Sequence, residues 1–293
     1  MYISTEINSF RAYGDLKKIL KLLKDAGFDA YDFSVFHGSQ GDALVSADDY
    51  LEQAKALRAY ADEIGIACNQ AHAPFPTATD DNYPRFNMST DAYNAWAYKK
   101  IVRSIEVVGI LGAKVIVVHP WNYYTLEENI KLYKSFEETA RKANVKIGVE
   151  NMWNWDKEKK VVCPAACSYH DDFKAHLDGL PKDVFVACVD LGHAEMQGLD
   201  TNAVTMLKTL GDRVEALHIH DNDLIHDSHA LPYSLSINFS AIIDALKEIG
   251  YQGDVTLEVD RFMPKFPLEL YPQAARFMAE IAQDMREKIL KKS

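Results

Sequence analysis

Six ionisable side chains occupy equivalent positions in a repeated pattern, because each one ends or directly follows a short apolar run. Three imidazoles and three carboxylates form a mixed nitrogen and oxygen donor set, which suits Mn, Zn, Co, Fe or Mg rather than a thiolate site. Taken singly, a polar residue after a strand is more often a solvated or capping residue than a ligand. The recurrence in six consecutive runs instead predicts one shared site lined by His72, His119, Glu150, Asp190, His220 and Glu258.

Two further motifs add side chains around this site. In Asp-Leu-Gly-His, His193 follows Asp190 by three residues and can turn back over the same pocket. Asp227 and His229 lie in a later loop that is able to fold over the opening, although a solvated loop role is equally compatible with the sequence. His226, in the same loop, has no assigned role.

The motif His-Ile-His-Asp ends the seventh expected strand. Because side chains alternate along a strand, His218 and His220 share one face. We expect His218 to lie deeper, in a layer of barrel side chains, and His220 to lie nearer the mouth. His220 is therefore the expected ligand of the two.

Nucleophilic and thiolate chemistry fit the sequence less well. Ser168 and Ser228 lack the Gly-x-Ser-x-Gly context of a nucleophile elbow. Cys163 and Cys167 form a Cys-x3-Cys pair that a metal could bind, but no second Cys or His pair stands nearby at zinc-site spacing. We therefore favour a structural role for these two cysteines.

Short β-rich runs alternate with longer amphipathic runs along the chain, a pattern typical of βα units and a parallel sheet. The expected strands are Tyr2–Glu6, Ala30–Ser34, Ile66–Ala71, Val115–His119, Lys146–Glu150, Val184–Asp190, Val214–His220 and Asp254–Val259. The expected helices lie near 15–26, 48–64, 89–112, 126–143, 170–178, 200–210, 239–249 and 270–290. Eight units in 293 residues, without the Gly-x-Gly-x-x-Gly turn of dinucleotide-binding folds, favour a closed barrel over an open sheet. The sequence therefore predicts an α/β fold, a (β/α)8 TIM barrel, with residues 1–293 as a single domain.

The composition limits the partners. The formal net charge is −11 and the pI is near 5.4, so a nucleic-acid backbone would be repelled, and we expect no nucleic-acid partner. The N-terminal residues lack the features of a signal peptide, and no apolar stretch approaches the ~20 residues that span a membrane. We expect a cytoplasmic protein without a membrane partner, and a homo-oligomer is compatible with the sequence.

The motifs and their order resemble those of a known family. Glu-Asn at 150–151, Asp-Leu-Gly-His at 190–193, His-Ile-His-Asp at 218–221 and Leu-Glu-Val at 257–259 are similar to motifs of the xylose isomerase-like TIM barrel superfamily. That superfamily includes sugar phosphate isomerases and epimerases, ketose 3-epimerases and endonuclease IV. The resemblance spans essentially the whole chain, and its specificity lies in the order and spacing of the motifs together.

Resemblance to the ketose 3-epimerases implies a single divalent metal, Mn, Zn, Co or Mg, bound by Glu150, Asp190, His220 and Glu258. The two glutamates would also act as the catalytic acid and base on opposite faces of the substrate. His193 would contact the sugar, and Asp156 matches a further carboxylate six residues after the first ligand. The chain departs from that pattern at His226, where those epimerases have an arginine, so the particular sugar stays open.

Resemblance to endonuclease IV implies a different site, a cluster of three metal ions. Its additional metal ligands would be His72, His119, His193, Asp227 and His229. The basic DNA-facing surface expected of such an enzyme is missing from this acidic chain. A multi-zinc phosphodiesterase or apurinic endonuclease is therefore the second hypothesis for the function, and a non-catalytic sugar-binding barrel is the third.

The favoured reading is a metal-dependent isomerase or epimerase of a small sugar, sugar phosphate or related polyhydroxy carbonyl compound. Metal would stabilise the enediolate while one glutamate removes a proton and the other returns it. We expect His72, His119, His193, Asp156, Trp121 and Trp153 to contact the substrate. Tyr123, Tyr124 and Trp155 are further aromatic residues for a wall against sugar C–H groups, with ordinary loop packing as the equal alternative.

Overall fold

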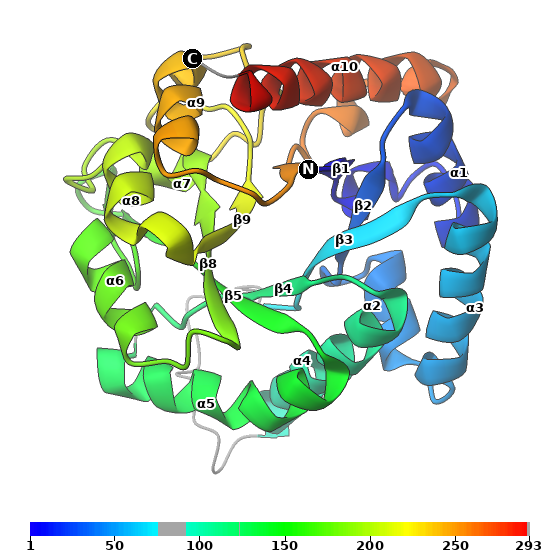
Figure 1. Ribbon diagram of the computed structural model, residues 1–293, viewed down its shortest axis with the longest axis horizontal. Helices are drawn as coiled ribbons and strands as arrows, with labels where there is room; N and C mark the ends of the chain where they lie inside the picture. Colours follow the sequence, from blue (N-terminus) through cyan, green and yellow to red (C-terminus); the bar gives the residue numbers. More distant parts are fainter. Residues whose placement is uncertain (76–91, 123, 292–293) are drawn as a thin grey trace.

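The computed structural model describes residues 1–75, 92–122 and 124–291. Within these ranges, eight parallel strands alternate with helices around a ring (Figure 1). The strands are β1 (Ile3–Thr5), β2 (Ala30–Ser34), β3 (Ala67–His72), β4 (Val115–Val118), β5 (Lys146–Glu150), β8 (Phe185–Asp190), β9 (Val214–His218) and β10 (Val255–Leu257). Each coincides with an expected strand to within two residues at either end.

The ring of strands closes through two parallel bridges. Strands β2, β3, β4, β5, β8 and β9 form one parallel sheet in that order, and β1 pairs in parallel with β10. The bridge between Glu6 and Asp32 joins β1 to β2, and the bridge between Ile219 and Leu257 joins β9 to β10. The predicted (β/α)8 TIM barrel is therefore confirmed.

The outer layer consists of the helices that the periodicity predicted (Figure 1). They are α1 (Leu16–Ala26), α3 (Tyr50–Ile64), α4 (Ala92–Leu111), α5 (Leu126–Ala143), α6 (His170–Asp178), α8 (Ala203–Leu210), α9 (Phe239–Glu248) and α10 (Tyr271–Leu290). Residues 89–91 of the expected third helix lie outside the described residues. Gly27 and Gly65 end α1 and α3 with φ of 105° and 72°, a left-handed conformation that costs glycine little. None of the helices described has the length and apolar character to cross a membrane.

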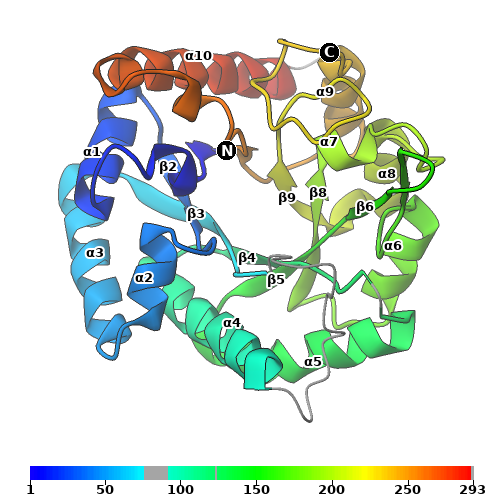
Figure 2. The same cartoon turned by 180° about the vertical axis from the view of Figure 1, so that it is seen from behind.

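Several short elements were not expected from the sequence. The short helices are α2 (Gln40–Ser46), α7 (Leu191–Ala194), η1 (Ile7–Phe10), η2 (Gly211–Arg213), η3 (Met263–Lys265) and η4 (Leu268–Leu270). A hairpin of β6 (Trp153–Asp156) and β7 (Val161–Pro164) follows β5, and its strands pair antiparallel. Figure 2 shows β6 beside α6 and α8, away from α1 and α3.

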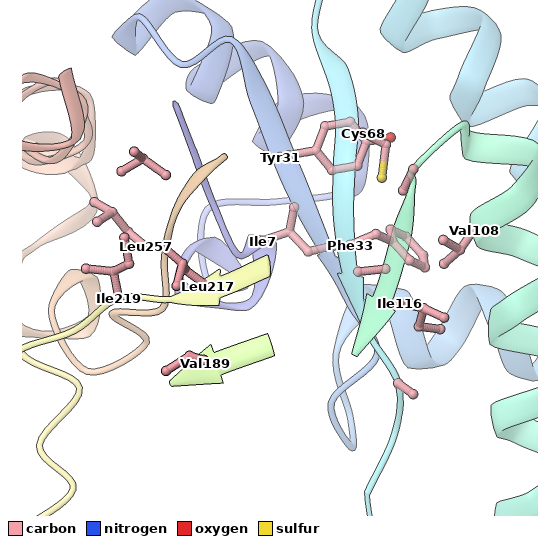
Figure 3. Packing of buried hydrophobic residues seen from close by; sticks show 14 of the residues in the cluster. Ile7, Tyr31, Phe33, Cys68, Val108, Ile116, Val189, Leu217, Ile219 and Leu257 are labelled. Atoms are coloured by element: carbon pink, nitrogen blue, oxygen red, sulfur yellow. The ribbon is translucent and has the colours of Figure 1, made fainter. Parts of the chain in front are cut away.

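Alternation along the strands separates two apolar layers. On β8, Phe185, Ala187 and Val189 pack into the large core between strands and helices, whereas Val186 and Cys188 belong to a small cluster inside the barrel. Figure 3 shows the large core where Val189, Leu217 and Leu257 lie on neighbouring strands and Ile219 lies just beyond β9. The next inward position on β8 is that of Asp190, which follows from the period of two.

Glu6 is a buried carboxyl group at the point where the ring closes. Its two oxygens accept the backbone N–H of Ser9 at 2.9 and 3.0 Å, and the Ser34 hydroxyl donates to it at 3.4 Å. Burial raises the pKa of Glu6 to about 7, with a further contribution from the negative charge of Asp260, although bonds from Ser9 oppose the shift. The folded protein therefore holds this proton more tightly than the unfolded chain does.

This difference predicts a pH-dependent stability. The stability contributed by protonated Glu6 is full below the unfolded pKa of 4.5 and is lost as pH rises through about 7. Glu6→Gln should reduce the fall in unfolding free energy between pH 5 and pH 8 by about 1–3 kcal/mol. Urea unfolding of both proteins in the presence of a chelator measures this, and an equal fall in both would contradict it.

Candidate functional site

Four inward side chains from neighbouring strand ends form a central group. Glu150 ends β5, Asp190 ends β8, His218 ends β9 and Glu258 directly follows β10. One ligand atom from each lies within 4.8 Å of those of the others, and all four side chains are buried. The Nδ1 atom of His218 lies 2.8 Å from Glu150 Oε1 and 3.3 Å from Glu258 Oε2. One nitrogen of the imidazole therefore approaches both carboxylates.

The histidine in this group differs from the one that the sequence analysis expected. His218 rather than His220 joins the two glutamates and Asp190. The register explains this, because a shift between Ala187 and Cys188 places Asp190 directly beside His218 on β9. His220 lies two residues beyond, yet its Nε2 still approaches Asp190 Oδ1 at 3.1 Å.

A second group shares Glu150 with the first. The Nε2 atoms of His72 and His119 lie 3.0 Å apart, and they lie 3.5 and 3.0 Å, respectively, from Glu150 Oε2. The ring of Phe75 stacks on His119 with centroids 4.6 Å apart, and Phe36 meets His72 edge-on at 4.9 Å. Neither phenylalanine was expected at the site, although each follows the carboxyl end of an expected strand.

A third group, His193, His220, Asp227 and His229, brings the β9–α9 loop over the strand ends. Asp227 Oδ2 lies 3.1 Å from His229 Nε2 and 3.5 Å from His193 Nε2. Its Oδ1 lies 3.5 Å from His220 Nε2. The loop residues are therefore part of the site and not merely solvated.

Buried polar residues of the motifs hold these groups in place. Asp221 accepts the backbone N–H groups of Asn222, Leu235 and Ile237 at 2.7–3.0 Å, which fixes both ends of the β9–α9 loop. Asn151 exchanges two hydrogen bonds with the backbone of Asp190, and its own carbonyl oxygen accepts from His193 Nδ1 at 2.9 Å. The Asp and Asn of the sequence motifs thus position ligand-type side chains rather than join them.

The site separates charged from neutral imidazoles. Burial lowers the pKa of His119 to about 4, despite the charge of Glu150, so this ring is neutral at pH 7. Burial also disfavours charge on His193 and His229, but the negative charges of Asp190 and Asp227 outweigh it. They raise the pKa of His193 to about 10 and that of His229 to about 9.

The two glutamates have opposite shifts. Burial would raise the pKa of Glu150, but the adjacent His218 and His119 hold it well below the usual range. Burial raises the pKa of Glu258 far above the usual range, and the charges of Glu150 and Asp190 raise it further. Without a cation, these surroundings therefore favour the carboxylate form of Glu150 and the protonated form of Glu258.

Unpartnered atoms in the three groups fit bound cations. Buried Glu150 Oε2, Asp190 Oδ2, His220 Nε2 and Asp227 Oδ1 make no hydrogen bond of normal geometry within the described part of the chain, although imidazole–carboxylate contacts of 3.0–3.5 Å surround three of them. Buried polar atoms are otherwise almost always paired. Carboxylate and imidazole donors at these separations suit Zn²⁺, Mn²⁺ or Co²⁺.

The other residues expected to contact the substrate lie in the β6–β7 hairpin and in loops, and not all of them face the site. Trp153 of the hairpin faces the site, with its ring centroid 6.4 Å from that of His193. Asp156 instead accepts the backbone N–H groups of 158 and 159 at the hairpin turn. Trp121 packs near Tyr124 with centroids 6.3 Å apart. The remaining loop residues are His226, which pairs with Asp223 and stacks on Trp155, and Tyr123, which lies outside the described residues.

The chain is a TIM barrel with carboxylates and imidazoles at the carboxyl ends of its strands, and sequence comparison identifies its family. The chain belongs to the xylose isomerase-like TIM barrel family, whose model matches residues 20–281.

Two curated relatives match parts of the chain. An uncharacterized protein of Methanocaldococcus jannaschii is 29% identical over 164 residues, which cover 53% of this chain and 54% of that protein. An uncharacterized protein of Sinorhizobium fredii is 24% identical over 279 residues, covering 85% and 83%. The first match thus spans about half of the relative's length.

Solved structures share the fold over nearly the full length. A D-tagatose 3-epimerase-like protein aligns with a TM-score of 0.71 at 21% identity, covering 99% of this chain and 100% of that one. The IolI protein with a bound zinc atom aligns with a TM-score of 0.70 at 18% identity, covering 99% and 98%. D-psicose 3-epimerase from Clostridium cellulolyticum aligns with a TM-score of 0.70 at 15% identity, covering 97% and 99%.

Gly192 is required by the ring of His220. A Cβ atom at position 192 would overlap that imidazole, so Gly192→Ala should displace His220 and destabilise the metal-free protein by about 1–3 kcal/mol. In a His220→Ala background the same substitution should cost at least ~1 kcal/mol less, because the obstructing ring is gone. Urea unfolding of the two single variants and the double variant measures this coupling. Additive costs would contradict the steric explanation.

Proposed function

We propose that this protein is a divalent-metal-dependent isomerase or epimerase of a small sugar, sugar phosphate or related polyhydroxy carbonyl compound. One observation carries the proposal. Two buried glutamates, Glu150 and Glu258, lie close together, because one ring nitrogen of His218, Nδ1, approaches a carboxylate oxygen of each. An enzyme that moves a proton from one face of a carbon to the other requires an acid and a base. These two carboxylates, which lie beside ligand-type residues, can supply both.

The metal in this proposal is bound by Glu150, Asp190, Glu258 and a histidine of the His-Ile-His-Asp motif. The grouping of side chains favours His218 for that role, and His220 then belongs with the Asp227 group. A bound divalent cation would polarise the substrate carbonyl and offset the negative charge that develops when the neighbouring carbon loses a proton.

The protein's own residues then supply proton transfer and orientation. One glutamate accepts the proton from the carbon, and the other donates a proton to the same or the neighbouring carbon. In this proposal, His193 and the neutral His119, which both lie near Glu150, hydrogen-bond substrate hydroxyl groups. Trp153 offers an apolar face to sugar C–H groups, whereas the turn contacts of Asp156 favour a role in holding the hairpin.

The comparisons support a sugar as the substrate class. Proteins with the same fold over nearly their full length are described as a D-tagatose 3-epimerase-like protein and D-psicose 3-epimerase. The zinc atom of the IolI protein supports a metal in this chain as well. The departure at His226 leaves the particular sugar open.

A product-resolved screen tests the activity. Purified protein loaded with Mn²⁺, Mg²⁺, Co²⁺ or Zn²⁺ should convert at least one ketose, aldose or inositol-derived ketone. The conversion should bring solvent deuterium to the carbon next to the carbonyl. Failure of every metal with every sugar class would overturn the proposal.

Glutamine variants test the role of the glutamates. Glu150→Gln or Glu258→Gln keeps an oxygen donor but loses the proton acceptor, so turnover and deuterium incorporation should fall at least ~10²-fold. The affinity for metal should fall, yet bound metal should remain measurable by mass spectrometry of the desalted protein. Full turnover in both remetallated variants would exclude proton transfer by these residues.

A second candidate is a multi-zinc phosphodiesterase similar to endonuclease IV. The observation that favours it is the contiguity of the three groups, since Glu150 belongs to two of them and Asp190 approaches the third through His220. Against it stands the net charge of −11, which weakens any association with DNA. Cleavage of abasic duplex DNA at catalytic protein concentration, lost on His193→Ala together with one zinc ion, would favour this candidate over the first.

A further inference from the structure

Another cluster of ligand-type side chains lies away from the strand ends, where the β6–β7 hairpin leads into α6. One ligand atom each from Cys167, Asp172 and His176 lie within 4.8 Å of one another. Cys167 is buried in the turn that precedes α6, whereas Asp172 and His176 lie one turn apart on that helix. The three side chains form a compact set of sulfur, oxygen and nitrogen donors, and none belongs to the groups described above.

The imidazole of His176 has an unused nitrogen in a buried position. Its Nδ1 lies 2.8 Å from the carbonyl oxygen of Asp172, and because a carbonyl only accepts, Nδ1 carries the proton of the neutral ring. Nε2 then has a free lone pair, and it makes no hydrogen bond to any described residue although His176 is only 2% exposed. An unpaired buried polar atom is destabilising, and a ligand at this position would remove that cost.

Ordinary structural roles explain only part of the cluster. Asp172 Oδ2 accepts the backbone N–H of Cys167 at 2.8 Å, so the carboxylate holds the turn that precedes α6 against the first turn of that helix. This contact accounts for neither the adjacent thiol nor the unpartnered ring nitrogen. A nucleophilic role does not fit either, because reactive cysteines lie in partly exposed positions and Cys167 is fully buried.

We propose that Cys167, Asp172 and His176 bind one structural divalent ion of the zinc type. Thiolate, imidazole and carboxylate are the donors that Zn²⁺ and Co²⁺ share in proteins. The Asp172 side chain is 41% exposed, so solvent reaches the cluster and water can complete four-coordination. The presence of an ion at this site does not depend on the activity proposed for the strand ends.

The ion fastens the base of the hairpin to α6. At that base, the N–H of Met152 donates to Ala166 O at 3.2 Å, one residue before Cys167. The same hairpin carries Trp153 toward His193. Binding at Cys167 therefore holds one wall of the strand-end site against the outer helix.

Cobalt absorption distinguishes this site from those at the strand ends. A thiolate-to-cobalt charge-transfer band requires a cysteine ligand, and the strand-end groups consist of His, Asp and Glu. Titration of reduced, metal-free, full-length protein with Co²⁺ should produce such a band. Its intensity should stop rising when one Co²⁺ ion per chain is bound at the cysteine. Cys167→Ala should abolish the band with an unchanged far-ultraviolet circular dichroism spectrum, while Cys163→Ala and Cys188→Ala should retain it.

Variants of the other two ligands test the proposal without removing the buried thiol. His176→Gln and Asp172→Asn should each weaken the cobalt band's apparent affinity at least about tenfold. Amide exchange across 161–168 should slow on metal addition in the wild type and not in His176→Gln. A wild type without the band, a band that survives Cys167→Ala, or a band lost in Cys188→Ala would each overturn the assignment.

Discussion

The alternation of side chains along eight strands in a closed ring is the constraint on which the rest of the structure depends. Val149, Val189 and Leu217 face the helices, so the residues that follow each of them, Glu150, Asp190 and His218, must face inward. At the carboxyl end of a closed barrel these inward positions converge. Charged groups are thereby forced together in a buried place, where neighbouring imidazoles or cations must balance them.

The fold and most residues of the site could be predicted from the sequence, because both depend on local periodicity. The eight strand positions follow from period two, the helices from period 3.6, and the polar residues at strand ends from their place after each apolar run. All residues of the three strand-end groups except His218 were expected as ligands. The hairpin escaped because Trp153–Asp156 and Val161–Pro164 pair with each other and are only partly buried, so they lack an apolar run.

The part that sequence could not supply depends on register and on contacts between distant segments. Which histidine of His-Ile-His-Asp lies beside Asp190 is set by an irregularity at Ala187 and Cys188, and no local pattern encodes it. Likewise, the spacing of Cys167, Asp172 and His176 becomes meaningful only when the turn and the first two turns of α6 are placed together. A cysteine-pair motif does not reveal this set, because two of its three donors lie on the helix that follows.

The hairpin between β5 and β8 has a consequence for how such proteins diversify. Its two strands pair with each other and, across the described ranges, with no strand of the barrel. Insertions, deletions or new side chains in its turn therefore leave the alignment of the carboxylates undisturbed. Natural selection can therefore change this side of the site entrance, and with it the shape of molecule that can enter, while the buried charged residues stay the same.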